Sequence, residues 1–163
     1  MSITTAQLVT LKASILAETN PTFIALRQTG ATGQMAEWIN GTLVPNQAAW
    51  LSSASSVALD EGADYSLFDS IVAGKRDAWA LFLRYAPRNM TRARNRKVVT
   101  DVWGNATAAS VAESILIAST RTITRGEGYL GGVVTATTGT VTALRLAWEG
   151  AISNDDVVQA VNA

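Results

Sequence analysis

Residues 125–146, RGEGYLGGVVTATTGTVTALRL, decide the fold class, because here the composition departs from that of the rest of the chain. The stretch is rich in Gly, Thr and Val, which disfavour helix and favour turns and strands. We expect a loop or a hairpin-like extended segment, which a strand through residues 143–150 would continue. Residues 126–142 are therefore predicted to form a flexible Gly/Thr-rich loop or extension.

The residues on either side of this stretch show helical periodicity. Leu8, Leu11 and Ile15 recur at helical spacing, and Pro21 ends that helix because it lacks the N–H needed to continue it. Further helices are predicted at residues 34–40, 45–59, 66–85, 91–103 and 107–124, with a last short one capped by Ser153. The expected fold is mainly α: one domain over residues 1–163, a bundle of five to seven helices with a short extended or hairpin-like segment near the C-terminus.

The composition excludes most catalytic chemistry. The chain has 163 residues, no cysteine and no histidine, and only 16% of its residues are charged. Without His or Cys it can form neither a typical zinc site nor a Ser-His or Cys-His hydrolase site. Sites made of carboxylates alone remain open. The low charge suits a subunit packed against others and is also ordinary for a small Ala-rich domain.

Three motifs could carry chemistry, and each has a simpler structural explanation. The glycine-rich residues 125–132 lack the Gly-Lys-Ser/Thr ending of a phosphate-binding loop, and a flexible turn is expected there. The acids Asp60, Glu61 and Asp64 do not have the spacing of a calcium loop. Asp155 and Asp156 suit the first turn of a helix, where acids stabilise the helix dipole. We therefore expect no enzyme, no cofactor and no metal site.

The sequence shows no sign of a membrane association. The N-terminus lacks the basic start and apolar core of a signal peptide, and no window has the roughly 20 apolar residues of a membrane span. The protein is expected to be soluble, to be synthesised in a cytoplasm and to have no membrane partner.

The most unusual feature is a basic segment, residues 84–97. It holds six of the 13 basic residues and no acid, so the rest of the chain has a net charge of −6. Its cations are Arg84, Arg88, Arg92, Arg94, Arg96 and Lys97. On a helix beginning near Thr91, Arg92 and Arg96 lie on one flank of a buried Val/Trp stripe, and Arg94 and Lys97 on the other.

Three interpretations of the basic segment remain open. Its arginines could form a solvated rim that pairs with acids of the same chain. They could contact an acidic surface of another subunit, because Arg suits bidentate pairing with carboxylates. They could also contact a nucleic-acid backbone, although a DNA-reading ridge would present its cations on one face.

Several motifs resemble those of one protein family. Residues 74–83 (GKRDAWALFL), 94–105 (RNRKVVTDVWGN) and 144–160 (LRLAWEGAISNDDVVQA) are similar, in this order, to segments of small structural proteins encoded near the major capsid protein in tailed bacteriophages. The N-terminal Leu8, Leu11, Lys12 and Ile15 also match its Leu-x-x-Leu-Lys-x-x-Ile pattern. Residues 29–63 match poorly, and a Trp-Arg-Thr-Ser segment of the relatives is missing.

The resemblance implies a virion structural protein, most plausibly a head–tail connector (adaptor) ring subunit in the neck, with no catalytic residues. It implies a homo-oligomeric ring of 12 subunits that docks to the portal and to other neck or tail proteins, with genomic DNA able to pass through. The interface residues expected are the six cations of the basic segment together with Asp155 and Asp156. A tail terminator, a minor head protein and a small nucleic-acid-binding regulator are the alternatives.

Overall fold

The computed structural model describes residues 3–105, 108–131 and 134–163, and its chain divides into two compact units. Unit 1 contains Met1–Gln47, Thr122–Val133 and Leu146–Ala163. Unit 2 contains Ala48–Arg121 and Val134–Arg145. Each unit has its own cluster of buried apolar side chains, and the chain passes between the units four times.

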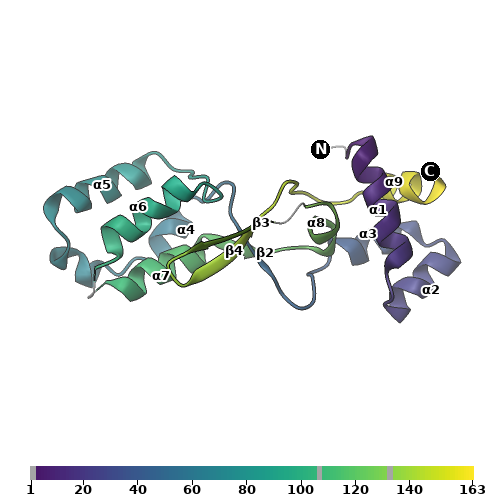
Figure 1. Ribbon diagram of the computed structural model, residues 1–163, viewed down its shortest axis with the longest axis horizontal. Coiled ribbons are helices and arrows are strands. Elements are labelled where there is room, and N and C mark those ends of the chain that lie inside the picture. The colour runs from purple at the N-terminus through teal and green to yellow at the C-terminus, as the bar shows by residue number, and fades with distance from the viewer. Residues whose placement is uncertain (1–2, 106–107, 132–133) are drawn as a thin grey trace. The chain divides into compact units, whose positions relative to one another are not determined.

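Unit 1 is built from helices α1 (Thr5–Ala17), α2 (Pro21–Thr29), α3 (Thr32–Asn40), α8 (Arg125–Leu130) and α9 (Asn154–Asn162) (Figure 1). Local signals set their ends. The Thr4 hydroxyl and the Gln7 side chain form a capping box at the start of α1. The Asn20 side chain caps α2, whose first residue is Pro21, and Gly30 ends it in the left-handed conformation at φ 68°.

Helices from the two ends of the chain form the core of unit 1. Helix α9 packs against α1 and α3, and α8 packs against the same two helices. Leu11, Phe23 and Ile39 are fully buried there, together with Val157 of α9. The Asn40 side chain fixes the C-terminal segment, because it donates to the Ile152 carbonyl and accepts from the Ile152 N–H, both at 2.8 Å.

Unit 2 combines helices with a sheet. Its elements are β1 (Ala48–Trp50), α4 (Ser56–Glu61), the 3-10 helix η1 (Tyr65–Ser70), α5 (Ala73–Arg84), α6 (Ala93–Trp103), α7 (Ala109–Ala118), β3 (Val134–Thr138) and β4 (Val141–Arg145). Strand β2 (Thr120–Thr122) lies where the chain leaves unit 2.

The sheet has the strand order β2-β1-β4-β3. Strands β3 and β4 form an antiparallel hairpin in which Thr138 is opposite Val141, so Gly139 and Thr140 make a two-residue turn. Strand β1 is parallel to β4, with Ala49 in register with Leu144. Helix α6 contacts β3, and α7 contacts β4, so helices cover one face of the hairpin (Figure 1).

An aromatic cluster fills the core of unit 2. Trp103 is completely buried, and its ring centroid lies 5.7 Å from that of Trp79 at an interplanar angle of 90°. Phe68 lies 5.8 Å away and Tyr65 6.3 Å away. Trp79 and Tyr65 meet Trp103 edge to face, a geometry that aromatic pairs prefer, and Phe68 is tilted by 39°. The cluster joins η1, α5 and α6 into one core.

The prediction of a mainly α bundle is wrong. The chain is an α plus β protein that is 58% helical and 13% strand, with ten helices and a four-stranded mixed sheet in its described parts. The hairpin-like segment near the C-terminus is present, and its strand β4 pairs with β1. Residues 48–50 of β1 lie within the segment that was predicted as a helix at 45–59. The helical spacing of Trp50, Leu51 and Ala54 gave a wrong prediction. Ala49 and Trp50 point to opposite faces of a short strand, and both are buried.

Other predicted boundaries also differ. The helix predicted at 107–124 ends at Ala118, and residues 120–122 form β2; its predicted start at Thr107 lies outside the described residues. The helix predicted at 66–85 is divided into η1 and α5. Residues 126–142, expected as a flexible loop or extension, contain all of α8 after Arg125 and most of the hairpin, and residues 132–133 lie outside the described part. The Ser153 cap of α9 is confirmed.

Candidate interaction surface

The six cations of the basic segment lie on three consecutive parts of unit 2. Arg84 is in the last turn of α5, where a cation stabilises the helix dipole. Arg88 is in the connection that follows, Arg92 is the residue before α6, and Arg94, Arg96 and Lys97 are in the first turns of α6. The structure places them in four different environments.

Arg88 serves the end of helix α5. Its Nε donates to the Phe82 carbonyl at 2.8 Å and its Nη2 donates to the Leu81 carbonyl at 3.3 Å. The guanidinium also lies 4.6 Å from the centroid of the Phe82 ring. Carbonyls in the last turn of a helix lack partners within the helix. Arg88 supplies a donor to that of Phe82 and adds to the long 3.4 Å bond that the Leu81 carbonyl accepts from the Tyr85 N–H. The half-buried side chain of Arg88 therefore stabilises the C-terminal end of α5 and is not presented to a partner protein.

Arg96 is a buried structural residue. Only 3% of it is exposed, its guanidinium lies 4.7 Å from the Trp50 ring centroid, and it donates to the Met90 carbonyl at 2.7 Å and to the Thr138 hydroxyl at 2.8 Å. Burial, with a further contribution from Arg145, lowers the pKa of Arg96. Arg96 thus joins α6 to strands β1 and β3 and does not lie on a surface rim.

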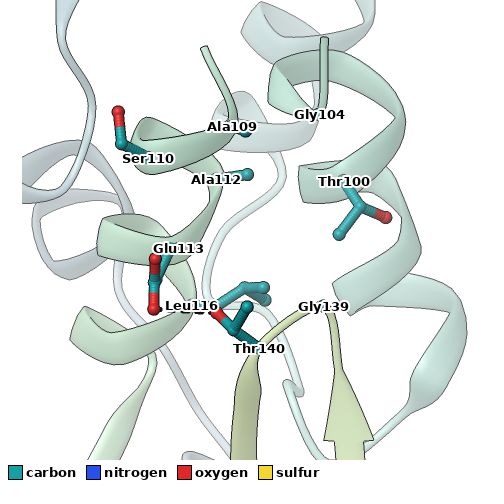
Figure 2. Close-up of a pocket in the computed structure, with 9 residues that line it drawn as sticks. All are labelled: Thr100, Gly104, Ala109, Ser110, Ala112, Glu113, Leu116, Gly139 and Thr140. Atoms are coloured by element: carbon teal, nitrogen blue, oxygen red, sulfur yellow. Dashed lines mark hydrogen bonds between the residues drawn. The ribbon is translucent and has the colours of Figure 1, made fainter. Parts of the chain in front are cut away.

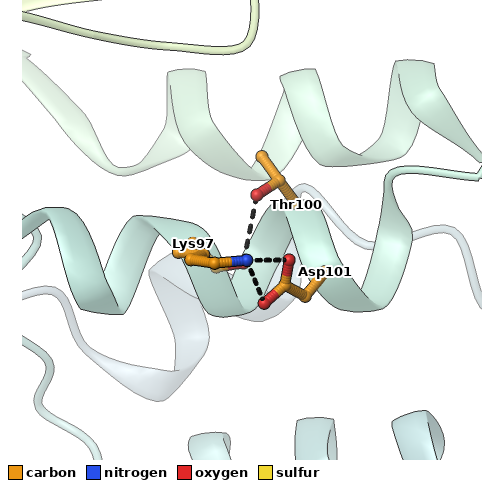
Figure 3. Close-up of polar contacts among 3 residues, drawn as sticks. All are labelled: Lys97, Thr100 and Asp101. Carbon is orange, nitrogen blue, oxygen red and sulfur yellow. Dashed lines mark hydrogen bonds and ion pairs between the residues drawn. The ribbon is translucent and has the colours of Figure 1, made fainter.

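Lys97 forms an ion pair within its own helix. Its Nζ lies 2.6 Å and 2.8 Å from the two carboxylate oxygens of Asp101, one turn further along α6, and the Thr100 hydroxyl donates to the Lys97 carbonyl at 3.0 Å (Figure 3). Both charged side chains are exposed, so the pair contributes only about 0.3–0.5 kcal/mol. Asp101 nevertheless offsets much of the positive charge at this position.

Arg84, Arg92 and Arg94 are the exposed arginines of the segment, and Lys97 is also exposed but is paired with Asp101. None of the three arginines forms an ion pair or a side-chain hydrogen bond within residues 3–105, 108–131 and 134–163. The interpretation that the basic segment pairs with acids of its own chain therefore applies to Lys97 alone. These three arginines are the ones available to an acidic partner.

The two acids proposed for the interface lie in unit 1, at the start of α9. Asp156 completes a capping box: its Oδ2 accepts from the Ser153 N–H at 2.9 Å and from the Ser153 hydroxyl at 2.7 Å. Asp155, beside it, is exposed. Asp156 is therefore occupied by the helix end, and Asp155 is the acid of this pair that a partner can reach.

The two units carry opposite net charges. Unit 1 contains 3 basic and 6 acidic residues, a net charge of −3, whereas unit 2 contains 10 basic and 7 acidic residues, a net charge of +3. The whole chain has zero net charge, but its excess negative charge lies in unit 1 and its excess positive charge in unit 2. Sequence counting found the positive segment but not this division, because each unit is assembled from distant parts of the chain.

Each unit has a hollow in its surface that could hold a small ligand. One, of about 430 Å³ in unit 2, lies among α6, α7 and the β3–β4 turn (Figure 2). Its lining is mostly apolar or small, and at its rim the Thr140 hydroxyl donates to Glu113 at 2.7 Å. The other, of about 240 Å³ in unit 1, has Tyr129 donating to Glu18 at 2.6 Å and Arg125 4.1 Å from the Trp38 ring. Their polar groups bond mainly to one another, so neither forms a catalytic constellation.

The remaining sequence motifs have structural roles. Asp64 accepts from the Ser66 N–H at 2.9 Å and caps η1, and Asp60 accepts from the Tyr65 hydroxyl. The glycine-rich motif forms helix α8, where Thr124 and Glu127 make a capping box, instead of the expected flexible turn. Among the residues with described positions there is no cluster of three potential metal ligands, and no helix is long and apolar enough to cross a bilayer.

No protein family, curated protein or solved structure matches this chain.

Proposed function

We propose that the chain is a structural subunit of a tailed-bacteriophage virion, a head–tail connector (adaptor) ring subunit in the neck that docks to the portal. The three motifs at residues 74–83, 94–105 and 144–160 support this proposal through their order and spacing. The protein has no catalytic role in this proposal and uses no cofactor. Its partners are copies of itself, twelve to a ring, the portal, and other neck or tail proteins.

The charge separation between the units is the observation that carries the proposal. A ring needs a heterologous contact, in which one patch of each subunit meets a different patch of the next. Unit 2 has a net charge of +3 and exposes Arg84, Arg92 and Arg94, and unit 1 has a net charge of −3, so one chain carries two units of opposite charge. Complementary charge favours head-to-tail contacts and disfavours contacts between like units.

Reversing two exposed arginines is expected to prevent assembly without unfolding the protein. The variant Arg92→Glu/Arg94→Glu places like charges in the head-to-tail contact, so we expect loss of rings in electron micrographs and a monomeric mass by light scattering. The control Lys75→Glu/Arg145→Glu changes the charge of unit 2 by the same amount outside the basic segment. Rings formed by the first variant at wild-type yield would contradict the proposal.

Locating the protein in intact particles tests the position in the virion. Density for the chain in a ring between the portal and the tail would support a connector. Density on the tail tube itself would assign it instead as a tail terminator, and density within the capsid shell as a minor head protein.

DNA binding is the second candidate function, and the number of exposed arginines predicts how strongly the affinity for DNA should depend on salt. Each phosphate contact contributes about −0.9 to the slope of log affinity against log salt, so three exposed arginines predict a slope of about −3. The six cations counted in the sequence would give about −5. Titration of the purified protein with duplex DNA at several salt concentrations measures the slope. A slope near −5 would show that Arg88, Arg96 and Lys97 leave their present partners.

A further inference from the structure

Strand β3 ends the sheet with backbone groups that no neighbouring strand uses. In a two-residue hairpin the pair of residues next to the turn, here Thr138 and Val141, exchanges backbone hydrogen bonds. Along the strands, hydrogen-bonded and non-hydrogen-bonded residue pairs then alternate. Ala136 therefore bonds to β4, whereas Thr135 and Thr137 direct their N–H and C=O groups away from it. Because β3 is last in the strand order, these four groups face outward in the described structure.

The free edge lacks the usual protection against strand addition. Soluble proteins protect edge strands with Lys, Pro, bulges or a covering element. The sequence of β3, VTATT, contains no charge and no proline, and its register with β4 runs through all five residues without a bulge. Thr135 and Thr137 are exposed, and 59% of Val134 is exposed. Strongly strand-forming residues thus present an open edge.

We propose that β3 of a second copy of this chain pairs antiparallel with β3 across a two-fold axis at Ala136. In this register Thr135 lies opposite the partner's Thr137, and Thr137 lies opposite the partner's Thr135. The outward groups then form four backbone hydrogen bonds, two in each pair. The two hairpins then supply the four central, antiparallel strands of one continuous eight-stranded sheet.

A second copy is the occupant because the edge complements itself. The strand has no charged side chain, so a two-fold contact sets no like charges directly opposite each other. Ala136 meets Ala136 at the axis, where its small side chain allows close approach. The facing threonines can repeat a contact already present in the hairpin, where the Thr137 and Thr142 hydroxyls lie 2.9 Å apart.

This contact goes beyond the proposed ring contact and differs from it in physical character. Strand pairing is isologous and uncharged, so its affinity should change little with ionic strength, whereas the head-to-tail contact weakens with added salt. A strand of five residues buries far less than the roughly 1,000 Å² of a stable interface. The strand contact therefore forms at high protein concentration, and it joins copies other than neighbours within one ring, since ring neighbours are not related by a two-fold axis.

Backbone amide exchange measured by NMR tests the pairing directly. In dilute protein the amides of Ala136 and Thr138 should be protected by β4, and those of Thr135 and Thr137 should exchange freely. At high concentration we expect exchange at Thr135 and Thr137 to slow at least tenfold, at both low and high salt. Equal exchange rates at all concentrations would overturn the proposal.

Two matched variants separate the edge from the rest of the hairpin. Thr137→Lys and Thr142→Lys add the same charge on the same face and remove the same hydroxyl contact, but only the first lies on the edge. Thr137→Lys should weaken self-association at least tenfold, and Thr142→Lys less than twofold. Equal effects would overturn the proposal. The Arg92→Glu/Arg94→Glu variant should keep the concentration-dependent protection, so failure of the ring contact is distinguishable from failure of strand pairing.

Discussion

Replacing Trp103 with alanine is expected to lower the free energy of unfolding of unit 2 by about 3–5 kcal/mol. Trp103 is completely buried and joins Trp79, Phe68 and Tyr65, so its removal leaves a cavity that three elements border. Total stabilities of 5–15 kcal/mol are usual for proteins, so the loss is a large fraction of the whole. Hydrogen exchange of amides in α5, α6 and α7 measures it.

The effect should stay within unit 2, because each unit has a separate buried cluster. Amides of α1 and α3 should keep wild-type protection in Trp103→Ala. The reciprocal variant Trp148→Ala removes a tryptophan from the unit 1 cluster and should destabilise α1, α3 and α9 instead. Equal loss of protection in both units from either variant would mean that they unfold as one cooperative domain.

Replacing Arg96 with alanine is expected to destabilise unit 2 by about 3 kcal/mol. The change leaves the Met90 carbonyl and the Thr138 hydroxyl without their charged donor, and hydrogen bonds to charged groups contribute about 1.5–3 kcal/mol each. It also removes the guanidinium from the Trp50 ring. Thermal and urea unfolding followed by tryptophan fluorescence measure the change.

Arg94→Ala is the matched control, two residues away in the same helix. Arg94 is exposed, so its replacement should change stability by no more than about 0.5 kcal/mol. The two variants should also differ in assembly: Arg94→Ala weakens the head-to-tail contact in a folded protein, and Arg96→Ala acts through stability. An Arg96→Ala protein as stable as Arg94→Ala would show that Arg96 is not required by the core.

The helices predicted from periodicity and caps were largely found, because those signals are local. Pro21, Gly41 and Ser153 stand at helix boundaries in the structure. The sheet could not be predicted in the same way. Strand β1 has three residues, and its pairing with β2 and with β4, nearly a hundred residues later, distinguishes it from the start of a helix.

For the basic segment, too, the sequence could not predict contacts with residues that are distant in the chain. Sequence spacing placed Arg96 on an exposed flank, but it could not show that Trp50 and Thr138 from distant strands would enclose its side chain. The exposure of Arg92 and Arg94 was consistent with the helical wheel. The open edge of β3 was missed because residues 134–138 were predicted only as a loop or a hairpin-like extended segment, with no pairing to the rest of a sheet. The alternation of Val, Ala and Thr around Gly139 was the available signal.

The four passages of the chain between the units have a consequence for folding during synthesis. Unit 2 has all its residues once position 145 has left the ribosome, although unit 1 begins 47 residues earlier. Unit 1 must wait for α9, because α1 and α3 pack against it. Since domains fold as units during translation, unit 2 should fold first. Helices α1 and α3 then expose their apolar faces until α9 has been synthesised, which makes these faces the natural binding site for a chaperone.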